Sequence, residues 1–235
     1  MQDKKATNVV WHEHSVKQAD RESLLRQKGV VLWFTGLPSS GKSTIANELA
    51  WRLHRCGRIA YVLDGDNIRH GLNCDLGFSA AARKENIRRI SEVGKLFADT
   101  GVITMTAFVS PYREDRDYCR QLLAKDRYVE VYVKASLQSC ERRDPKGLYG
   151  RARKGEIPEF TGVSAPYEAP LAPEIVLDTD QLSLEEECTL LISYLERQGV
   201  VGGVPAASFP SSAAEAGLFP GRREGGVPDN LVCEG

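Results

Sequence analysis

Short apolar runs rich in β-branched and aromatic residues recur along the chain and alternate with segments of helical periodicity. Five runs are predicted to be buried strands, over residues 30–35, 58–64, 101–109, 128–133 and 174–178. After the first run, Ile45, Leu49 and Leu53 recur every fourth residue, which is typical of a helix with one buried face. Strands that alternate with helices need crossover connections, so the pattern predicts an α/β fold with a mostly parallel sheet and helices on both faces.

Further helices are predicted over residues 16–27, 68–72, 114–124, 136–142 and 183–197. In the helix over 114–124, Tyr118, Leu122 and Leu123 are expected to face the core. Ser183 and Glu186 form a capping box that opens the last helix.

Composition sets the domain organisation. The 235 residues suit one α/β domain with a tail: we assign 29–198 to the domain, 1–28 to an N-terminal extension and the Gly- and Pro-rich 199–235 to a disordered tail. A net charge of −1 argues against a dedicated nucleic-acid-binding or membrane-surface protein. The six cysteines form no C-x-x-C pattern, no apolar run would span a bilayer, and the start lacks the apolar core of a signal peptide. A cytoplasmic location is therefore expected.

The first run leads directly into GLPSSGKS at residues 36–43, which fits the G-x-x-x-x-G-K-[ST] pattern in full. A strand before it and a helix after it are the context in which this pattern forms a phosphate-binding loop. Lys42 is expected to reach the β- and γ-phosphates of ATP, and the Ser43 hydroxyl to ligate Mg²⁺. The predicted ATP-binding residues in this loop are Gly36, Leu37, Pro38, Ser39, Ser40, Gly41, Lys42, Ser43 and Thr44.

The second run ends in Asp64, and a second acid, Asp66, follows after Gly65. Carboxylates at the carboxyl end of a parallel strand lie in the crevice where α/β sheets bind ligands. One of Asp64 and Asp66 is expected to support Mg²⁺, with Asp64 as the metal candidate, and one to accept a proton from an attacking hydroxyl. Which acid is the base stays open, as does the alternative that Asp66 only caps the following helix.

Arginine and aromatic side chains then gather around a predicted loop at 71–82. Arg69, Arg83, Asn86 and Phe78 combine guanidinium groups for phosphate with a ring for a base, although composition alone favours Phe78 as a core residue. The third strand ends at Ser110, which is expected to contact phosphate.

The segment 144–173 is too long for an ordinary connection and carries glycines between basic residues, among them Lys146, Arg151 and Arg153. It is either a lid that closes over a triphosphate or a solvated loop.

Taken together, these residues closely resemble the adenylylsulfate kinase (APS kinase) family from about residue 8 to residue 197. The segments that carry the resemblance include WFTGLPSSGKST, LDGDNIRHGLN, FVSPYR and DPKGLYGRARKGEIPEFTG. The resemblance implies a P-loop kinase fold and transfer of the ATP γ-phosphoryl group to the 3′-hydroxyl of adenosine 5′-phosphosulfate (APS). The products would be 3′-phosphoadenosine 5′-phosphosulfate and ADP, with Mg²⁺ as cofactor, and a homodimer is expected because family members are usually dimers.

The resemblance also implies residue roles. It places the APS adenine between Phe78 and Phe160, which replaces the core interpretation of Phe78. The implied substrate-binding residues are Asp66, Arg69, Phe78, Arg83, Asn86, Val109, Ser110, Lys146, Leu148 and Phe160. Arg151 and Arg153 would join the ATP site, and the catalytic candidates are Lys42, Asp64, Asp66 and Ser110. Ser110 matches a serine described as a phosphorylated intermediate in bacterial members, but direct in-line transfer needs only Lys42, Mg²⁺ and an aspartate.

The chain departs from the family pattern at Pro38 and Ser39 in the loop and at Ala82, where the family usually has Asp. The alternatives to an APS kinase are another small-metabolite or nucleotide kinase and a catalytically silent nucleotide sensor.

Overall fold

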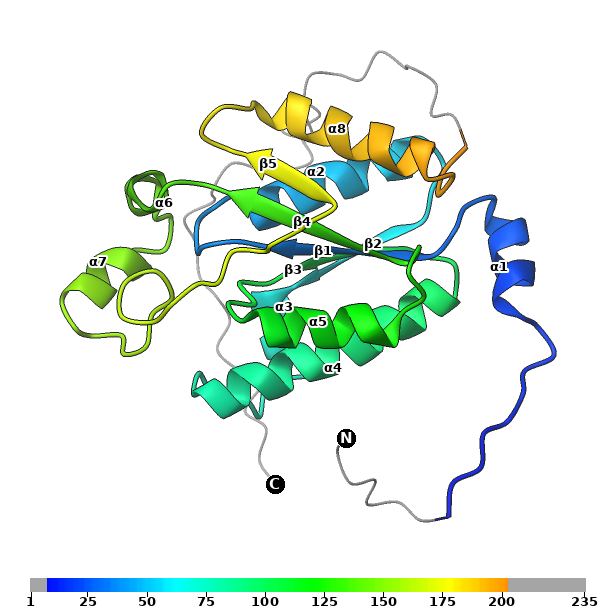
Figure 1. The fold of residues 1–235 in the computed structure, drawn as a ribbon, viewed down its shortest axis with the longest axis horizontal. Helices are drawn as coiled ribbons and strands as arrows, with labels where there is room; N and C mark the ends of the chain where they lie inside the picture. The colour runs from blue at the N-terminus through cyan, green and yellow to red at the C-terminus, as the bar shows by residue number, and fades with distance from the viewer. Residues whose placement is uncertain (1–7, 203–235) are drawn as a thin grey trace, which may run out of the picture. The chain divides into compact units, whose positions relative to one another are not determined.

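The computed structural model describes residues 8–202, and Figure 1 shows their arrangement. Five strands form one parallel sheet in the order β2-β3-β1-β4-β5. The strands are β1 Val30–Thr35, β2 Ala60–Asp64, β3 Ile103–Ala107, β4 Tyr128–Lys134 and β5 Ile175–Asp178. The helices are α1 Gln18–Leu25, α2 Lys42–Arg55, α3 Gly65–Arg69, α4 Ala80–Asp99, α5 Arg113–Leu122, α6 Leu137–Arg143, α7 Leu148–Arg153 and α8 Leu184–Arg197. The predicted α/β fold, with a parallel sheet and helices on both faces, is confirmed.

The central strand β1 contributes to two hydrophobic cores, one on each face of the sheet. Because side chains alternate along a strand, Val30, Leu32 and Phe34 pack in the core beneath α2 and α8. Val31 and Trp33 point the other way and pack against α4 and α5. All six residues of β1 are buried. An uninterrupted apolar run is therefore what a strand covered by helices on both faces requires.

The predicted helices at 68–72 and 114–124 differ from the prediction in their bounds or in their buried face. The helix after β2 begins at Gly65 rather than at residue 68, because the Asp64 carboxylate caps it by accepting a hydrogen bond from the Asp66 N–H over 3.0 Å. The capping acid is therefore Asp64 and not Asp66. In α5 the buried residues are Asp115, Arg116 and Cys119, whereas the predicted inward-facing Tyr118, Leu122 and Leu123 are only half-buried. A buried ion pair, described below, allows this charged face to turn inward.

Both predicted domain boundaries fall inside packed structure. Gln27 is buried, and its side-chain amide donates to the carbonyls of Ile59 and Gly101, each over 2.8 Å. On the other side, Val200 and Val201 lie in the core, and Val201 pairs with Gln27 as an antiparallel bridge. The domain therefore includes Gln27 and reaches at least to Val201, and the rest of the predicted tail, 203–235, lies outside the described residues.

The segment 144–173 is ordered and has a small core of its own, so the solvated-loop alternative does not describe it. Cys140, Tyr149, Ala152 and Phe160 are buried together, and Leu37 of the glycine loop packs against them. Helix α7, which the sequence analysis did not predict, lies in this segment and projects beyond the carboxyl ends of the strands (Figure 1). The segment is therefore attached to the phosphate-binding loop by an apolar contact.

Candidate active site

The loop between β1 and α2 has a backbone geometry that requires glycine at two positions. A Cβ at Gly36 would lie 2.4 Å from the carbonyl oxygen of Val133, so only glycine fits beside β4. Gly41 has a φ of 107°, a value that side-chain-bearing residues rarely adopt, and Ser39 also has a positive φ, of 60°. The Pro38 carbonyl accepts a hydrogen bond from the Tyr149 hydroxyl over 3.0 Å, so α7 is tied directly to this loop.

Lys42 folds back over the loop. Its ammonium donates to the carbonyls of Gly36, over 3.0 Å, and Leu37, over 2.7 Å, and the residue is buried. Burial lowers the pKa of Lys42 to about 8, and the neighbouring Cys140 and Asp64 side chains offset part of this lowering. The ammonium is thus held by neutral carbonyls at the position from which it would reach a bound phosphate.

The two predicted acids occupy different positions. The Ser43 hydroxyl donates to Asp64 Oδ2 over 2.6 Å, and Asp64 Oδ1 accepts the Asp66 N–H that caps α3. The Asp66 carboxylate instead pairs with Lys146 of the lid. Asp64 therefore belongs to the phosphate-loop side of the site, and Asp66 faces the lid.

The predicted substrate-binding arginines flank an exposed aromatic ring. Phe78 is 66% exposed, so the core interpretation from composition is wrong. The Arg69 guanidinium lies 4.4 Å from the centroid of the Phe78 ring. Arg83 donates to the Phe78 carbonyl over 2.9 Å and to the Glu159 carbonyl over 3.1 Å. One arginine thus connects the Phe78 loop to the residue that precedes Phe160 in the lid.

The orientation of Asn86 depends on Asn73, a residue that the sequence analysis missed. Asn73 is fully buried, and its amide donates to Asn86 Oδ1 over 2.9 Å. Asn86 therefore keeps its own N–H₂ group as a donor. The pairing joins a turn after α3 to the first turns of α4, a contact that sequence spacing does not reveal.

Ser110 is placed differently from the expectation. It is 2% exposed, and its hydroxyl accepts from the Trp33 indole over 3.1 Å and donates to the Thr35 hydroxyl over 3.0 Å. Its φ of 40° is unusual for a residue with a side chain. The preceding carbonyl, of Val109, accepts from Thr35 over 2.9 Å. The Ser110 side chain is therefore held toward the interior at the end of β3.

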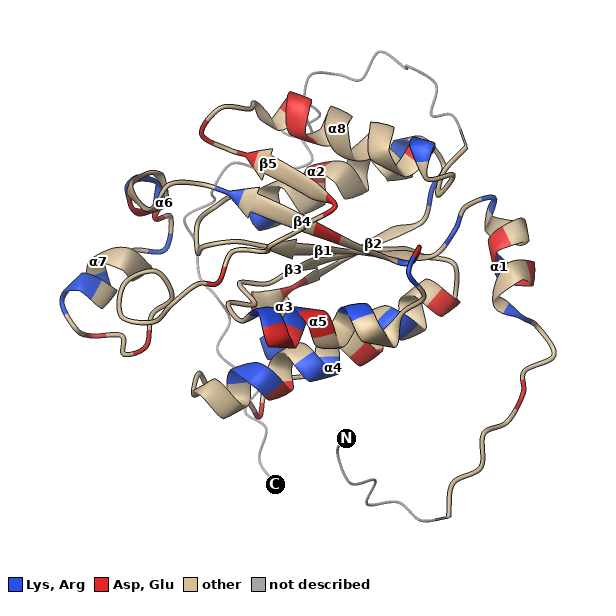
Figure 2. Cartoon of the chain, viewed as in Figure 1, with Lys and Arg blue, Asp and Glu red and all other residues tan. Residues whose placement is uncertain are grey.

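The basic residues of the lid divide into two groups. Lys146 turns toward Asp66, whereas Arg151 pairs with Glu156 and Arg153 pairs with Glu141, both at exposed positions. Figure 2 shows the positive charge that this places on α7. The structure therefore brings Lys146, but not Arg151 and Arg153, together with the predicted acids. Leu148 and Phe160 belong to the lid core.

Arg143 is a further residue that the sequence analysis missed. Its guanidinium donates to the Thr179 hydroxyl and carbonyl, each over 2.8 Å, and reaches the Ser40 carbonyl at 3.4 Å. It thereby joins the phosphate-binding loop to the end of β5. Arg143 stands at the end of α6, one residue beyond the predicted helix, and a lone charge there carries no sequence signal.

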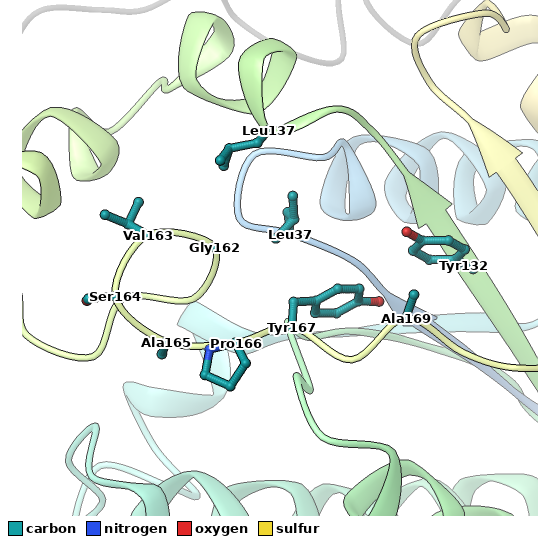
Figure 3. A pocket seen from close by; sticks show the side chains of 10 residues that line it. All are labelled: Leu37, Tyr132, Leu137, Gly162, Val163, Ser164, Ala165, Pro166, Tyr167 and Ala169. Carbon is teal, nitrogen blue, oxygen red and sulfur yellow. The ribbon is translucent and has the colours of Figure 1, made fainter.

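A cleft of about 600 Å³ is lined by residues 162–167 and 169 of the lid on one side and by Leu37, Tyr132 and Leu137 on the other (Figure 3). Leu37 is the single predicted site residue on its wall. The cleft is therefore separate from the acids and arginines described above. Within residues 8–202, no cluster of three or more His, Cys, Asp or Glu side chains is arranged to bind a metal ion, and no helix is long and apolar enough to cross a membrane.

Comparisons with known proteins decide the family. The family described as "Adenylylsulphate kinase" matches residues 28–178. The chain belongs to the adenylylsulphate kinase family. It is 58% identical over 191 residues to the "Probable adenylyl-sulfate kinase" of Halalkalibacterium halodurans, which covers 81% of this chain and 95% of that protein. It is 58% identical over 192 residues to the "Adenylyl-sulfate kinase" of Oceanobacillus iheyensis, covering 82% and 96% of the two chains.

A solved structure agrees with this membership. The Mycobacterium tuberculosis APS kinase CysC in complex with AMPPNP and APS is 47% identical, has a TM-score of 0.70, and covers 72% of this chain and 99% of that one. The predicted membership, the P-loop kinase fold and the predicted function of an ATP-dependent adenylylsulfate kinase are therefore confirmed.

Proposed function

We propose that this adenylylsulfate kinase transfers the ATP γ-phosphoryl group to the 3′-hydroxyl of APS in a site formed by the loop 36–43, the two acids after β2 and the lid. The observation that carries this proposal is the pair of contacts at the carboxyl ends of β1 and β2. Ser43 bonds Asp64 on the phosphate side, and Asp66 pairs with Lys146 on the lid side. These contacts support the proposal because they bring Ser43, Asp64, Asp66 and Lys146 into one small region.

The residues present fit a magnesium ion. Ser43 Oγ and Asp64 Oδ2 are two oxygen donors 2.6 Å apart at the start of α2, and hard cations such as Mg²⁺ take oxygen ligands together with water and substrate phosphates. Ser43 would bind the ion directly and Asp64 would hold it through water. The ion, when bound with ATP, supplies positive charge that neutralises the β- and γ-phosphate oxygens.

The geometry supports a division of labour between the acids. Both carboxylate oxygens of Asp64 are engaged, one by Ser43 and one by the Asp66 N–H that begins α3. Asp66 is more than half exposed and has Lys146 as its ion-pair partner. We assign Asp66 to the acceptor, where it takes or guides the 3′-hydroxyl proton, and Lys42 to the migrating phosphoryl group. Lys146 is then available to the phosphosulfate of APS when substrate separates it from Asp66.

The base-binding part of the site rests on Phe78 and Phe160. Phe78 presents an open ring already backed by Arg69, whereas Phe160 is 8% exposed and packs edge-on against Tyr149 at 5.0 Å. Adenine stacking between the two rings therefore requires Phe160 to expose a face when the lid moves. Arg83, which bonds the Phe78 and Glu159 carbonyls, limits how far the two aromatic loops separate. Arg69, Arg83 and Asn86 are assigned to the phosphosulfate and ribose, and Val109 and Leu148 to the walls.

The experiment that tests the proposal is an acceptor screen in a coupled ADP assay, with APS, AMP, shikimate and gluconate. ADP release that needs APS supports the proposal, whereas turnover with another acceptor would favour a different metabolite kinase. Tight ATP and APS binding without ADP would favour the silent sensor. A Phe78→Ala variant serves as the site control, because loss of one stacking face is expected to raise KM for APS about tenfold and to leave KM for ATP unchanged.

We also propose that the chain acts as a cytoplasmic homodimer. The five cysteines of the described residues are free thiols, in keeping with a reducing compartment. Val9, Val10 and Trp11 expose 68%, 79% and 82% of their surface on the N-terminal extension, and Leu24 of α1 exposes 82%. Apolar residues exposed in a row are typical of an interaction surface, and a second copy is the occupant we assign to it. Sedimentation velocity of the full chain and of a variant lacking residues 1–14 tests this assignment.

A further inference from the structure

We propose that Arg116 is a positioning residue for phosphoryl transfer, because its buried guanidinium fastens the returning end of the lid to the active-site loop after β3. Arg116 lies on α5 and is 1% exposed, and none of its contacts belongs to the ATP or APS site assigned above except the backbone of Ser110. Buried arginines are rare unless every donor has a partner, so the identity of those partners indicates what this one does.

The first partner is the loop after β3. Arg116 NH1 donates to the Ser110 carbonyl over 2.7 Å. Ser110 has a left-handed φ of 40°, a conformation that costs free energy and persists where surrounding contacts enforce it. The Ser110 side chain is held by Trp33 and Thr35, and its carbonyl is held by Arg116. Arg116 therefore completes the set of contacts that fixes this loop.

The second partner is the chain that returns from the lid to β5. Arg116 NH2 donates to the Glu168 carbonyl over 2.7 Å. The neighbouring Arg113 donates its N–H to the Glu168 carboxylate over 2.9 Å and its side chain to the Ala169 carbonyl over 2.8 Å. Glu168 in turn donates its N–H to the Pro111 carbonyl over 2.8 Å. The start of α5 thus anchors residues 168 and 169, and the movable part of the lid ends before them rather than at residue 173.

The charge of Arg116 is balanced inside the protein. Its Nε donates to Glu130 Oε1 of β4 over 2.7 Å, and Glu130 is also buried. The Glu130 Oε2 atom accepts from Arg120 over 3.2 Å, and Arg120 pairs with Glu174 at the start of β5. The planar fork of a guanidinium meets one carboxylate and two separate carbonyls at once, which a lysine ammonium cannot do in the same geometry.

A second chain of contacts joins the same region to the phosphate-binding loop. The Thr35 hydroxyl, immediately before Gly36, lies 3.0 Å from the Tyr167 hydroxyl and 3.0 Å from the Ser110 hydroxyl. The Arg116 guanidinium lies 5.9 Å from the centroid of the Tyr167 ring. Three segments form the site: the phosphate-binding loop, the loop after β3 and the lid. Their polar side chains therefore meet in one buried cluster beneath the site. Arg116 is the member that carries a charge and spans two of the segments.

This role predicts that loss of the two carbonyl contacts loosens the lid. Phe160 and Lys146 belong to the lid, and their contact with APS rests on the proposed function. If a smaller fraction of the protein has its lid closed, the apparent affinity for APS falls in proportion to that fraction. ATP binds mainly to the loop 36–43, which Arg116 does not touch, so ATP binding should change little.

The test compares Arg116→Lys with Arg120→Lys in the full chain. Both variants keep a positive charge beside Glu130 on the same helix, but Arg120 donates to no carbonyl of the lid or of the loop after β3. We expect Arg116→Lys to raise KM for APS about tenfold and to leave KM for ATP within about twofold. Amide hydrogen exchange in peptides covering 156–169 should become about tenfold faster at the same time. An Arg116→Met variant, which keeps the stem and removes every donor, should show the same pattern more strongly.

The outcome separates this proposal from the assignment of the substrate. If the lid peptides exchange faster in Arg116→Lys but APS is not phosphorylated by the parent enzyme, the anchor stands and the proposed function fails. If exchange over 156–169 is the same in Arg116→Lys and Arg120→Lys, the anchoring role is refuted, even where thermal stability falls. Equal increases in the KM values for APS and ATP would also refute it, because they would indicate a general loss of structure.

Discussion

Ser43 and Asp64 are joined by a hydrogen bond of 2.6 Å, although Ser43 lies on the helix after β1 and Asp64 ends β2, and these two strands are not neighbours in the sheet. Strand β3 lies between β1 and β2, and the two side chains meet above its carboxyl end. The contact requires α2 to begin at Lys42 and α3 to begin at Gly65, so that both helix starts point into the same crevice. This is the position at which ligands bind to open α/β sheets.

The first prediction concerns Lys42 and pH. Burial lowers its pKa to about 8 in the free protein, and a bound triphosphate, being negatively charged, raises the pKa again. Below about pH 8 the ammonium is already charged and the Kd for ATP is flat. Above that pH, binding requires uptake of a proton, so the Kd should rise by up to about tenfold per pH unit until the pKa of the complex is reached.

Isothermal titration with AMPPNP from about pH 7 to pH 9.5 measures this effect. Ionisation of the triphosphate itself is common to the parent and to a Lys42→Met variant, so comparison of the two isolates the contribution of Lys42. A Lys42→Met variant should bind more weakly and lose the pH dependence. A flat profile for the parent protein across pH 8–9.5 would contradict the position assigned to Lys42.

The second prediction concerns Ser110. Its hydroxyl faces Trp33 and Thr35 in the interior, so it is not presented as a nucleophile to ATP. Incubation of the parent enzyme with γ-³²P-ATP in the absence of APS should leave no label on the protein. A Ser110→Ala variant should keep turnover within about tenfold of the parent, since it loses neutral hydrogen bonds. Stoichiometric labelling that disappears in Ser110→Ala would show a covalent intermediate instead.

The third prediction concerns the orientation of Asn86. Replacing Asn73 with Ala removes the buried donor to Asn86 Oδ1 and leaves that oxygen without its partner. KM for APS should rise about five- to tenfold, with a smaller change in kcat, because a binding contact rather than a reacting group is disturbed. Ser91→Ala is the matched control. Ser91 is another buried polar residue of this region, on α4, and bonds the Ile87 carbonyl of its own helix. Identical KM values for the two variants would rule out the positioning role of Asn73.

The fourth prediction concerns stability. Burial raises the pKa of Glu187 to about 7, and its Oε1 atom has no hydrogen-bond partner among the described residues 8–202. Because the folded-state pKa lies above the unfolded one, the folded state binds more protons between about pH 4.5 and pH 7, and stability falls as the pH rises through that window. Glu187→Gln should therefore be more stable than the parent at pH 8, by roughly 1–2 kcal/mol, and this gain should shrink toward pH 5.

Urea unfolding of both proteins at pH 5 and pH 8 measures the difference. Glu185→Gln provides the opposite control, because its bond to Arg52 lowers the pKa of Glu185. That substitution should lower stability at pH 8 and have less effect as the pH falls toward the acidic range. An advantage of Glu187→Gln that is equal at both pH values would contradict the burial argument.

The strands and the phosphate-binding loop could be read from the sequence because each depends on local chemistry. Residues 30–34 are all apolar, and such a run indicates a strand covered on both faces without reference to the rest of the chain. The glycines at 36 and 41 are needed for the backbone itself. The Ser183 and Glu186 capping box was also predictable and is present, since it involves four consecutive residues.

The features that sequence reasoning missed depend on partners far along the chain. Arg116 lies in the helix whose inward face was predicted from its apolar residues, and its burial makes sense only when Glu130 and the Glu168 carbonyl are placed beside it. Asn73 likewise gains a role only through Asn86. Helix α7 was missed because its glycines favour a loop, and the Asp144 carboxylate caps its start by accepting from the Leu148 and Tyr149 N–H groups. Such contacts are properties of the fold rather than of a motif.

The division of labour between Asp64 and Asp66 is the central claim, and a coupled ADP assay with saturating APS and ATP over a range of Mg²⁺ concentrations tests it most directly. Asp66→Asn is predicted to lower kcat by about 10²- to 10³-fold with the parent's Mg²⁺ requirement, because the acceptor for the 3′-hydroxyl proton is lost. Asp64→Asn is predicted to lower kcat and also to shift the Mg²⁺ requirement upward. Parental kcat in Asp66→Asn, or the same Mg²⁺ shift in both variants, would contradict it.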